Sequence, residues 1–416
     1  MDAEPNLGLP PYLRDPVSRS RRRPSQRRSP SRKPPTRRGG AGRPRKRVWL
    51  SLLALLFVSP AIYSWIQMAR LPSSLPIGVR SVEWLRQHHF NWLVDETEHY
   101  YYSWFNQPQK GGPGLTSLPP VGITTTPATH VKSDYVPPNI KPVFANPLPG
   151  EGVWRPSGPP VNGGPPVLVT TFRTETAYPQ IVAYLAWFDH TRTASAYYPG
   201  RYEPPAATLR GPSMVPYSQR WRLLSTFNGG FIYADGLNGD SLNGVTNEPF
   251  KNGNATVVAY KNGKVDIVDW KYGPTAPANI AWARQSLPLI VNHGQLNPKL
   301  NLSTDWGYTL GNAVRVWRTG LGIDRHGNLI YVAADYQTVI TLAQILKRAG
   351  AVRAMELDIN PEWYTLITYR HQHGHLTPTQ VAYNYQQAST RYLVPDDRDF
   401  FAIYRRVPGQ ITVPLK

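Results

Sequence analysis

Two carboxylates lie close together in the segment Ala354–Trp363, whose sequence is AMELDINPEW. If the residues Val352–Ile359 form a strand, its side chains alternate between two faces, so Glu356 and Asp358 share one face. A polar side turned toward solvent would give the same pattern. Two carboxyl groups on one face, directly before a proline-containing turn, are also what acid–base or glycoside chemistry requires. We therefore take both residues as catalytic candidates.

Two further segments place turns and polar groups where strands are expected to end. Leu224–Phe231 (LSTFNGGF) runs into Asn-Gly-Gly, where the missing side chains let the backbone approach a ligand closely, although a plain turn would have the same sequence. Arg318–Asp324 (RTGLGID) supplies a guanidinium group, and the strand that follows it ends at Asp335. With the carboxylate segment, these motifs define a candidate site drawn from distant parts of the chain.

Together, the three segments resemble the phosphodiester glycosidase family over roughly residues 215–365. The motifs that carry the resemblance are, in chain order, Asn-Gly-Gly-Phe at 228–231, a Pro-Leu strand ending in Gly at 288–294, Arg-Thr with Gly-Ile-Asp at 318–324, a helix from Thr-Leu at 341–342 to Gly-Ala at 350–351, and Leu-Asp at 357–358. The family strand usually continues Leu-Asp-Gly-Gly-Gly-Ser, whereas this chain continues Leu-Asp-Ile-Asn-Pro-Glu. A proline turn thus replaces the glycine-rich turn, and Glu356 stands where the family often has Asn.

The resemblance implies hydrolysis of a sugar-1-phosphodiester. Asp358 is then the carboxylate beside the anomeric carbon, with Glu362 or Glu356 as its acid–base partner. Arg318 is expected to hold the negative charge of the leaving phosphate through paired hydrogen bonds. The expected substrate-binding residues are Asn228, Gly229, Gly230, Thr319, Asp335 and Asn360, although Asp335 could simply terminate its strand. No cofactor is predicted and no metal motif is visible, while a divalent cation bound by carboxylates stays open.

The elements that must position these residues are mainly short strands. Strands are expected at 167–172, 181–188, 255–260, 265–269 and 329–333, and Lys261–Lys264 (KNGK) joins the third and fourth as a hairpin. Thr341 is expected to cap a helix whose apolar residues recur at i, i+3, i+4 and i+7 before Gly350. The predicted fold class is α+β, a mixed, largely antiparallel sheet domain with few helices.

Composition and charge describe what surrounds this domain. The 416 residues include no cysteine, which excludes disulfides, thiolate metal sites and cysteine nucleophiles, and favours a bacterial origin. Residues 1–47 contain 15 Lys/Arg and 3 Asp/Glu, so they hold +12 of the net charge of +20. They are predicted to form a disordered basic tail in the cytoplasm. Nucleic-acid binding by this tail is the alternative, and no nucleic-acid partner is predicted.

A stretch without formal charge follows the basic tail. Residues 48–69 read VWLSLLALLFVSPAIYSWIQMA, and about 20 such residues in a helix can cross a bilayer. The basic flank favours a transmembrane signal anchor, with a cleaved signal peptide as the competing interpretation. The prediction is a single-pass cell-membrane protein whose N-terminus is cytoplasmic and whose C-terminal domain is extracellular or periplasmic. The lipid bilayer is then one of its partners.

Three segments make up the rest of the chain. Residues 70–106 are expected to form an aromatic juxtamembrane helix with Ser81 as its N-cap. A metal site at His88, His89 and His99 is not favoured, because no partner ligands stand at a fixed spacing. Residues 107–149 are rich in Pro and Gly, which indicates a linker or an extended strap. The folded domain is expected at 150–410.

The predicted function is therefore a membrane-anchored hydrolase outside the cytoplasm that cleaves a sugar-1-phosphodiester or related glycoside of the cell envelope. Its second expected partner is this carbohydrate or glycopolymer. The alternative is a non-catalytic envelope protein that binds a glycopolymer, which the aromatic content and the altered proline turn also fit. An enzyme requires Asp358 and a second carboxyl group in one pocket with Arg318 and Asn228.

Overall fold

The computed structural model describes residues 44–104, 107–122, 135–233, 238–301, 303–306, 315–372 and 374–409. Most of the predicted basic tail, residues 1–43, lies outside this part of the chain. The chain divides into two compact units, residues 1–60 and residues 61–416. Everything that positions the candidate site belongs to the second unit, so the description that follows concerns that unit unless α1 is named.

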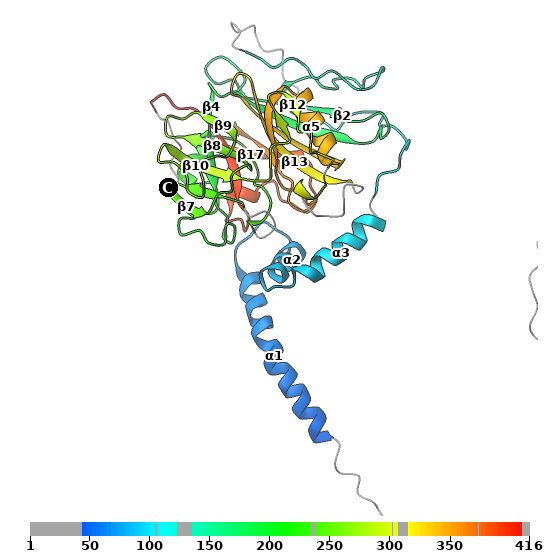
Figure 1. Ribbon diagram of the computed structural model, residues 1–416, viewed down its shortest axis with the longest axis vertical. Helices are drawn as coiled ribbons and strands as arrows, with labels where there is room; N and C mark the ends of the chain where they lie inside the picture. Colours follow the sequence, from blue (N-terminus) through cyan, green and yellow to red (C-terminus); the bar gives the residue numbers. More distant parts are fainter. Residues whose placement is uncertain are drawn as a thin grey trace, which may run out of the picture. The chain divides into compact units, whose positions relative to one another are not determined.

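Three helices precede the sheets: α1 (Pro44–Arg70), α2 (Ile77–Gln87) and α3 (Asn91–Trp104) (Figure 1). The helix α1 covers the predicted anchor at 48–69. None of the helices in the described ranges combines the length and the apolar character that crossing a bilayer requires.

The predicted juxtamembrane helix is two helices, and its predicted N-cap is wrong. α2 starts directly after Pro76, so Ser81 lies inside the helix, where its hydroxyl donates to the carbonyl of Ile77 over 2.8 Å. Pro76 occupies the N-cap position with φ −57° and ψ 147°, an extended conformation that its ring permits directly before the helix. The chain then breaks at His89, whose φ of 67° is incompatible with a continuing right-handed helix.

The strands of the described chain form three sheets in which every neighbouring pair is antiparallel. The largest contains, in order, β1 (Arg155–Pro156), β2 (Val167–Arg173), β3 (Val182–Phe188), β14 (Leu329–Gln337), β13 (Val316–Asp324), β15 (Ala351–Glu356), β11 (Val291–Asn292) and β12 (Gln295–Leu296). The predicted strand at 352–359 therefore ends at Glu356, before Asp358 is reached.

Two five-stranded sheets complete the domain. One contains β7 (Val245–Glu248), β6 (Asp240–Leu242), β10 (Ile280–Gln285), β8 (Ala255–Tyr260) and β9 (Val265–Asp269). The other contains β17 (His375–Ala382), β16 (Leu366–Gln372), β5 (Leu223–Asn228), β18 (Phe400–Arg405) and β4 (Thr193–Tyr198). The short 3₁₀ helices are η1 (Tyr217–Arg222), η2 (Ser303–Trp306) and η3 (Arg391–Leu393). This arrangement confirms the α+β class and all five predicted strands, including the 261–264 hairpin.

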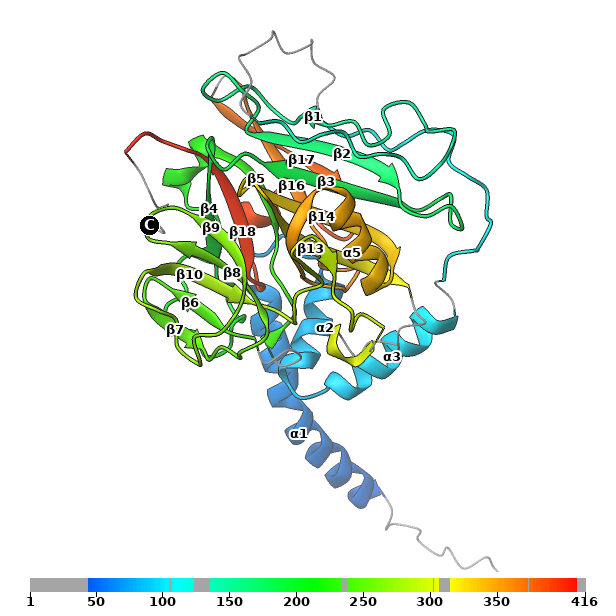
Figure 2. The same cartoon turned by 45° about the horizontal axis from the view of Figure 1, so that its top comes forward.

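The eight-stranded sheet is buried on both faces. Along β14, residues 329, 331 and 333 belong to the core that all three sheets share, whereas residues 330, 332 and 334 pack in the core that contains α5 (Val339–Arg348) (Figure 2). Gly320 and Gly322 let this helix lie close to β13, because a Cβ at Gly320 would lie 2.9 Å from a methyl carbon of Leu346. Burial on both faces explains why these strands read as continuous apolar runs.

The helix α5 is capped by Thr338 and not, as predicted, by Thr341. Thr338 has extended backbone, and its hydroxyl accepts from the N–H of Thr341 over 3.2 Å. The hydroxyl of Thr341 in turn accepts from the N–H of Thr338 over 2.9 Å, which completes a capping box. Both threonines satisfy backbone donors at the helix start, so the predicted residue belongs to the cap but takes the third helical position.

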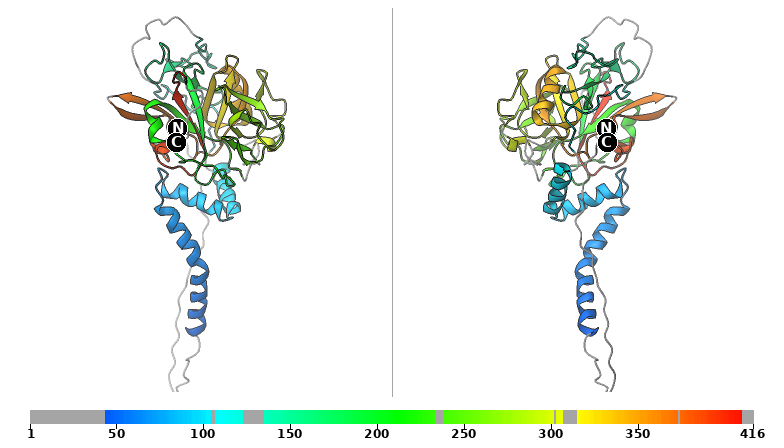
Figure 3. Two further views of the ribbon diagram at one scale, coloured as in Figure 1. Left: turned by 90° about the vertical axis from the view of Figure 1, so that its left-hand side faces the viewer. Right: turned by 90° about the vertical axis from the view of Figure 1, so that its right-hand side faces the viewer.

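The stem helices, α2 and α3, lie at one end of the sheets (Figure 3). Ser74 donates to the carbonyl of Arg391 over 3.3 Å, and Leu75 and Val79 pack against the indole of Trp363. Parts of the segment predicted as a linker or strap also bind the domain, since the N–H of Ile140 donates to the carbonyl of Gly152 over 2.9 Å. The described part of 107–149 thus includes backbone that is hydrogen-bonded to the domain.

Candidate functional site

The start of β13 holds the carboxylate segment in place. The N–H of Thr319 donates to the carbonyl of Asp358 over 3.0 Å, and the Thr319 hydroxyl donates to the same oxygen over 2.7 Å. The N–H of Leu357 donates back to the carbonyl of Thr319 over 2.8 Å. Three hydrogen bonds thus fix Asp358 beyond the end of β15, where the alternation of a strand no longer determines its orientation.

The Asp358 carboxylate is buried against an arginine that the motifs do not include. Its Oδ2 accepts from Nη2 of Arg398 over 2.8 Å, and its Oδ1 accepts from the N–H of Asn360 over 2.9 Å. Asp358 is 6% exposed and Glu356 is fully buried, so the interpretation of these residues as a solvent-facing side is wrong. Burial raises the pKa of Asp358, and the positive charge of Arg398 opposes that rise.

Arg318, the predicted phosphate holder, is bound to Glu356 instead. Its Nη1 donates to Oε1 of Glu356 over 2.6 Å, and its Nε donates to the carbonyl of Gln337 over 2.9 Å. Burial raises the pKa of Glu356 to about 7, against the opposing charge of Arg318. Within the described chain, Oε2 of Glu356 has no hydrogen-bond partner. The two candidate carboxylates therefore bind two different guanidinium groups.

Asn228 connects the three motifs through a side chain that is already fully bonded. Its Nδ2 donates to the Thr319 hydroxyl over 3.0 Å and to the carbonyl of Gly229 over 2.8 Å. Its Oδ1 accepts from the Tyr331 hydroxyl over 2.6 Å and from the N–H of Thr365 over 3.1 Å. A role in binding substrate would require some of these bonds to break, so Asn228 is placed to fix the site rather than to contact a ligand.

The glycine turn makes room for a charged segment from the end of the chain. The N–H of Gly229 donates to the carbonyl of Asp399 over 3.0 Å, and a Cβ at Gly229 would lie 2.3 Å from the Asp399 carboxylate. Asp399 pairs with the buried Arg284 over 2.7 Å. The carbonyl of Gly230 lies 3.5 Å from Nη2 of Arg398. The turn therefore packs against residues 396–399 and brings Arg398 to Asp358.

Sequence reasoning missed Arg398, although a signal was present. Residues 396–399 read DDRD and directly precede the apolar run FFAIY of β18. All four residues are at most 6% exposed. Four consecutive charges next to a core strand, in a body with few charges, must be paired inside the fold. Their partners come from distant segments, so the sequence alone does not identify them.

Glu362 is a second carboxyl group at this site. Its N–H donates to Oδ1 of Asn360 over 2.8 Å, which holds the proline turn in shape. Burial, together with the nearby negative charges of Glu98 and Glu83, raises the pKa of Glu362 to about 7. Within the described residues its Oε2 has no hydrogen-bond partner. A carboxyl group with this pKa can both give and take a proton near neutral pH.

The stem helix α2 closes the site. Oε2 of Glu83 lies 3.8 Å from Nη1 of Arg398, so this guanidinium stands between Glu83 and Asp358. Glu83 is 6% exposed, and burial raises its pKa. Arg86 pairs with Glu98 over 2.9 Å, which ties α2 to α3. We refer to Asp358, Arg398, Glu362 and the covering Glu83 as the Asp358 site.

Asp335 lies in different surroundings. Its Oδ1 accepts from the N–H of Tyr336 over 2.7 Å. Burial, and after it the negative charge of Asp335, raises the pKa of Tyr184 and Tyr364. Burial raises the pKa of Asp335 itself to about 7. Among the residues that the structure describes, no group of three or more His, Asp or Glu is arranged to hold a metal ion.

Residues 224–358 match the model of the phosphodiester glycosidase family. The match spans the Asn-Gly-Gly turn, the Arg-Thr strand and Asp358, and it confirms the resemblance that these motifs carry. It also supports the predicted hydrolase class, with phosphodiester-linked sugars as the class of substrate. No curated protein matches the chain.

Three solved structures are similar to parts of the chain. The first is the catalytic domain of zebrafish N-acetylglucosamine-1-phosphodiester alpha-N-acetylglucosaminidase, auto-inhibited by its pro-peptide, at 15% identity and a TM-score of 0.36, over 59% of this chain and 85% of that one. A hypothetical protein from Synechocystis has 14% identity and a TM-score of 0.31, over 60% and 64%. A putative exported protein from Burkholderia pseudomallei has 10% identity and a TM-score of 0.29, over 54% and 74%.

Proposed function

We propose that the domain hydrolyses a sugar-1-phosphodiester at the Asp358 site, with Asp358 beside the anomeric carbon and Arg398 holding the phosphate. The observation that carries this assignment is the pairing of Asp358 with a buried guanidinium that the carboxylate of Glu83 approaches from the stem helix. The guanidinium of Arg318 is paired with Glu356 and not with Asp358, so it is the less direct candidate for the phosphate.

The chemistry suits these groups. Water forms a bond to the anomeric carbon, while the bond from that carbon to the phosphate oxygen breaks and its electron pair leaves on the phosphate. The products are a free sugar and a phosphate monoester. The leaving oxygen carries little proton affinity, so holding its charge matters more than protonating it. The proton of the attacking water passes to Asp358 or to Glu362, whose pKa of about 7 suits the transfer.

Access to the site requires α2 to move away. Glu83 lies 3.8 Å from Arg398, in the position beside the guanidinium that the phosphate of a substrate would take. Leu75 and Val79 cover Trp363, whose ring lies 4.8 Å from the guanidinium carbon of Arg398. The covered state is therefore a resting state, and substrate and Glu83 compete for one positive charge.

The test is hydrolysis of a panel of glycosyl-1-phosphodiesters by the full chain, by its Glu83→Gln variant and by a Glu83→Gln, Asp358→Asn double variant. Glu83→Gln weakens the contact of α2 with Arg398, so the assay with this variant does not depend on spontaneous opening of the site. Turnover that Asp358→Asn abolishes, in a protein that still unfolds cooperatively, supports the proposal and names the sugar. Turnover that survives Asp358→Asn overturns the assignment of Asp358, and no turnover in any arm overturns the activity.

One observation favours a second candidate, binding of a glycopolymer without turnover. The turn after Asp358 contains Pro361 in place of glycines, and its shape is fixed by hydrogen bonds from Asn360 and Glu362. A rigid turn leaves fewer backbone N–H groups able to reach a phosphate. In the same panel this candidate predicts saturable sugar binding by Glu83→Gln with no product.

We further propose that the chain is anchored in a cell membrane with the domain outside the cytoplasm, and that the substrate belongs to the cell envelope. Support comes from the charge-free residues 48–69, which follow a strongly basic segment. Extraction of membranes from expressing cells tests the anchor. Release by alkaline carbonate, or recovery in the soluble fraction, contradicts it. Cleavage of the domain by protease added to intact spheroplasts tests the orientation.

A further inference from the structure

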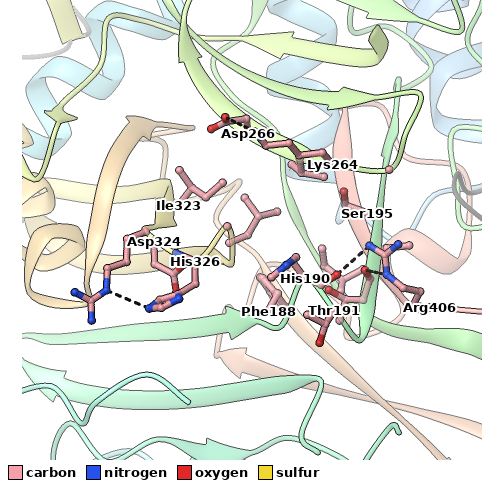
Figure 4. A pocket seen from close by; sticks show the side chains of 18 of the residues that line it. Phe188, His190, Thr191, Ser195, Lys264, Asp266, Ile323, Asp324, His326 and Arg406 are labelled. Carbon is pink, nitrogen blue, oxygen red and sulfur yellow. Dashed lines mark hydrogen bonds and ion pairs between the residues drawn. The ribbon is translucent and has the colours of Figure 1, made fainter. Parts of the chain in front are cut away.

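A second cleft lies at the opposite end of β13 from the Asp358 site. Its volume is about 670 Å³, and it opens where the β13–β14 hairpin, the β8–β9 hairpin and the turn at 189–192 meet (Figure 4). Arg318 and Thr319 mark one end of β13, and Asp324 marks the end at this cleft. None of the predicted site residues lines it. We call it the hairpin cleft, and its lining residues come from all three sheets.

The walls of the hairpin cleft combine apolar surface with hydroxyl groups. Phe188, Ile323 and Ile403 contribute apolar surface, and Thr191 and Ser195 contribute hydroxyls. Within the described chain the buried Ser195 hydroxyl has no hydrogen-bond partner. A buried hydroxyl left unbonded costs free energy that a ligand's polar group would recover. Apolar surface with a few placed polar groups, in a volume of this size, is typical of small-molecule sites.

The charge of the cleft is predominantly positive. Four cationic side chains line it against two carboxylates; these residues are Lys264, Arg325, Arg353 and Arg406, with Asp266 and Asp324. The carboxylate oxygens of Asp324 are occupied, since they accept from Trp187, Asn328 and the N–H of His326. These donors are neutral, so Asp324 keeps its negative charge, and the four cations and two carboxylates leave the lining with a formal charge of +2.

The other carboxylate, Asp266, is shared between two cations, whereas two further cations have no carboxylate partner in the described part of the chain. Asp266 pairs with Arg353 and lies 3.6 Å from Nζ of Lys264. Arg406 donates to the carbonyls of Thr193 and His190, and Arg325 donates to a ring nitrogen of His326. Within the described chain, neither Arg406 nor Arg325 pairs with a carboxylate. Arginine side chains without a counter-ion at a concave surface attract oxyanions.

We propose that the hairpin cleft binds a phosphorylated saccharide. The sugar ring lies against the apolar wall. Its hydroxyls donate to the Thr191 oxygen, whose own proton is bound to Asp189, and form a hydrogen bond with the Ser195 hydroxyl. The phosphate lies toward the cationic rim formed by Lys264, Arg325 and Arg406. This binding is separate from hydrolysis, because the Asp358 site shares no lining residue with the cleft. The proposal therefore stands or falls independently of the proposed activity.

The test measures binding to the full chain by calorimetry, with a hexose 1-phosphate, inorganic phosphate and an uncharged methyl hexoside as probes. All proteins carry Asp358→Asn, so that hydrolysis does not consume the probe and binding is separated from activity. The test variant is Lys264→Gln with Arg325→Gln, two exposed side chains whose change should leave the fold intact. Lys261→Gln is the matched control, since Lys261 is an exposed lysine of the same β8–β9 hairpin that does not line the cleft.

We expect the hexose phosphate to bind, and the double change to weaken it about tenfold, because two charge-assisted contacts are lost. The Lys261→Gln control should bind as tightly as the parent, and added salt should weaken binding in both. If inorganic phosphate binds as tightly as the hexose phosphate, the sugar is not recognised and the proposal is wrong in that part. If the methyl hexoside binds as tightly, the phosphate is not recognised. Unchanged binding in the double variant, or no binding by the parent, overturns it.

Discussion

Nη2 of Arg398 lies 2.8 Å from Oδ2 of Asp358, and both side chains are buried. This pair joins the end of the family motif to a segment 40 residues further along the chain. The other buried arginine of the motifs, Arg318, pairs with a different carboxylate, Glu356. The following predictions separate these two arginines and test the groups around them.

Replacing each arginine by lysine distinguishes their roles. Arg398→Lys keeps the charge but loses the paired donors, so the KM for a phosphodiester substrate should rise about 10- to 100-fold. Arg318→Lys should lower the free energy of unfolding by about 2–4 kcal/mol, because Glu356 stays buried with a poorer partner. Steady-state kinetics and urea unfolding of both variants provide the measurements. A raised KM in Arg318→Lys together with lower stability in Arg398→Lys would instead assign phosphate binding to Arg318.

Loosening the stem should activate the enzyme. Glu83→Gln removes the negative charge that competes for Arg398. If the free energy that favours the covered state falls by about 1 kcal/mol, the fraction of open molecules rises roughly fivefold. We expect kcat/KM to rise by a similar factor. Glu96→Gln is the control, since Glu96 is an exposed carboxylate on α3. Lower activity in Glu83→Gln, with Glu96→Gln unchanged, would instead make Glu83 part of the working site.

Protonation of Glu362 should make stability depend on pH. Its pKa rises from an ordinary 4.5 to about 7 on folding, so folding takes up a proton between these values. Stability from this group is therefore greatest below pH 4.5 and falls as the pH rises toward 7. Between pH 5 and pH 8, the free energy of unfolding should change by about 1–2 kcal/mol less in Glu362→Gln than in the parent. Thermal unfolding at both pH values decides, and an identical pH dependence in the two proteins contradicts burial of this carboxyl.

Asn228→Ala should act on stability before it acts on catalysis. The side chain makes four hydrogen bonds that join β5, β13 and β14, and their loss leaves buried partners unsatisfied. We expect the free energy of unfolding to fall by about 2–4 kcal/mol. Asn262→Ala, at an exposed asparagine, should change it by less than about 0.5 kcal/mol. Full stability with a raised KM would show that Asn228 contacts substrate after all.

Local patterns predicted much of the domain. The hairpin at 261–264 and the strands β8 and β9 follow from Asn-Gly between apolar runs, and their bounds agree with the structure. The cap of α5 was misplaced by three residues because Thr338 and Thr341 both have the side chain that a cap requires. The strand before Asp358 was predicted too long, because its apolar alternation continues past Glu356 while its regular register with β13 ends there. Two further backbone hydrogen bonds still join Thr319 to Leu357 and Asp358.

The site was predictable only where its residues share one motif. Asp358 and Thr319 were found, and the structure joins them through two hydrogen bonds. Arg398 and Glu83 were not predicted, because they reach the site only through the packing of segments that are far apart in the sequence. The same holds for the pairing of Arg318 with Glu356, which crosses from β13 to β15. Local spacing carries no information about which of several buried arginines faces which carboxylate.

The cover on the Asp358 site has a consequence for the order of synthesis. Ser74, beside the start of α2, binds the carbonyl of Arg391, a residue 317 positions later in the chain. At about 5–20 residues per second, the stem leaves the ribosome roughly 15–60 seconds before the segment that completes the site. The stem helix has therefore been synthesised before the domain can fold. We expect each molecule to fold with the Asp358 site covered, so that opening of the site takes place only after synthesis.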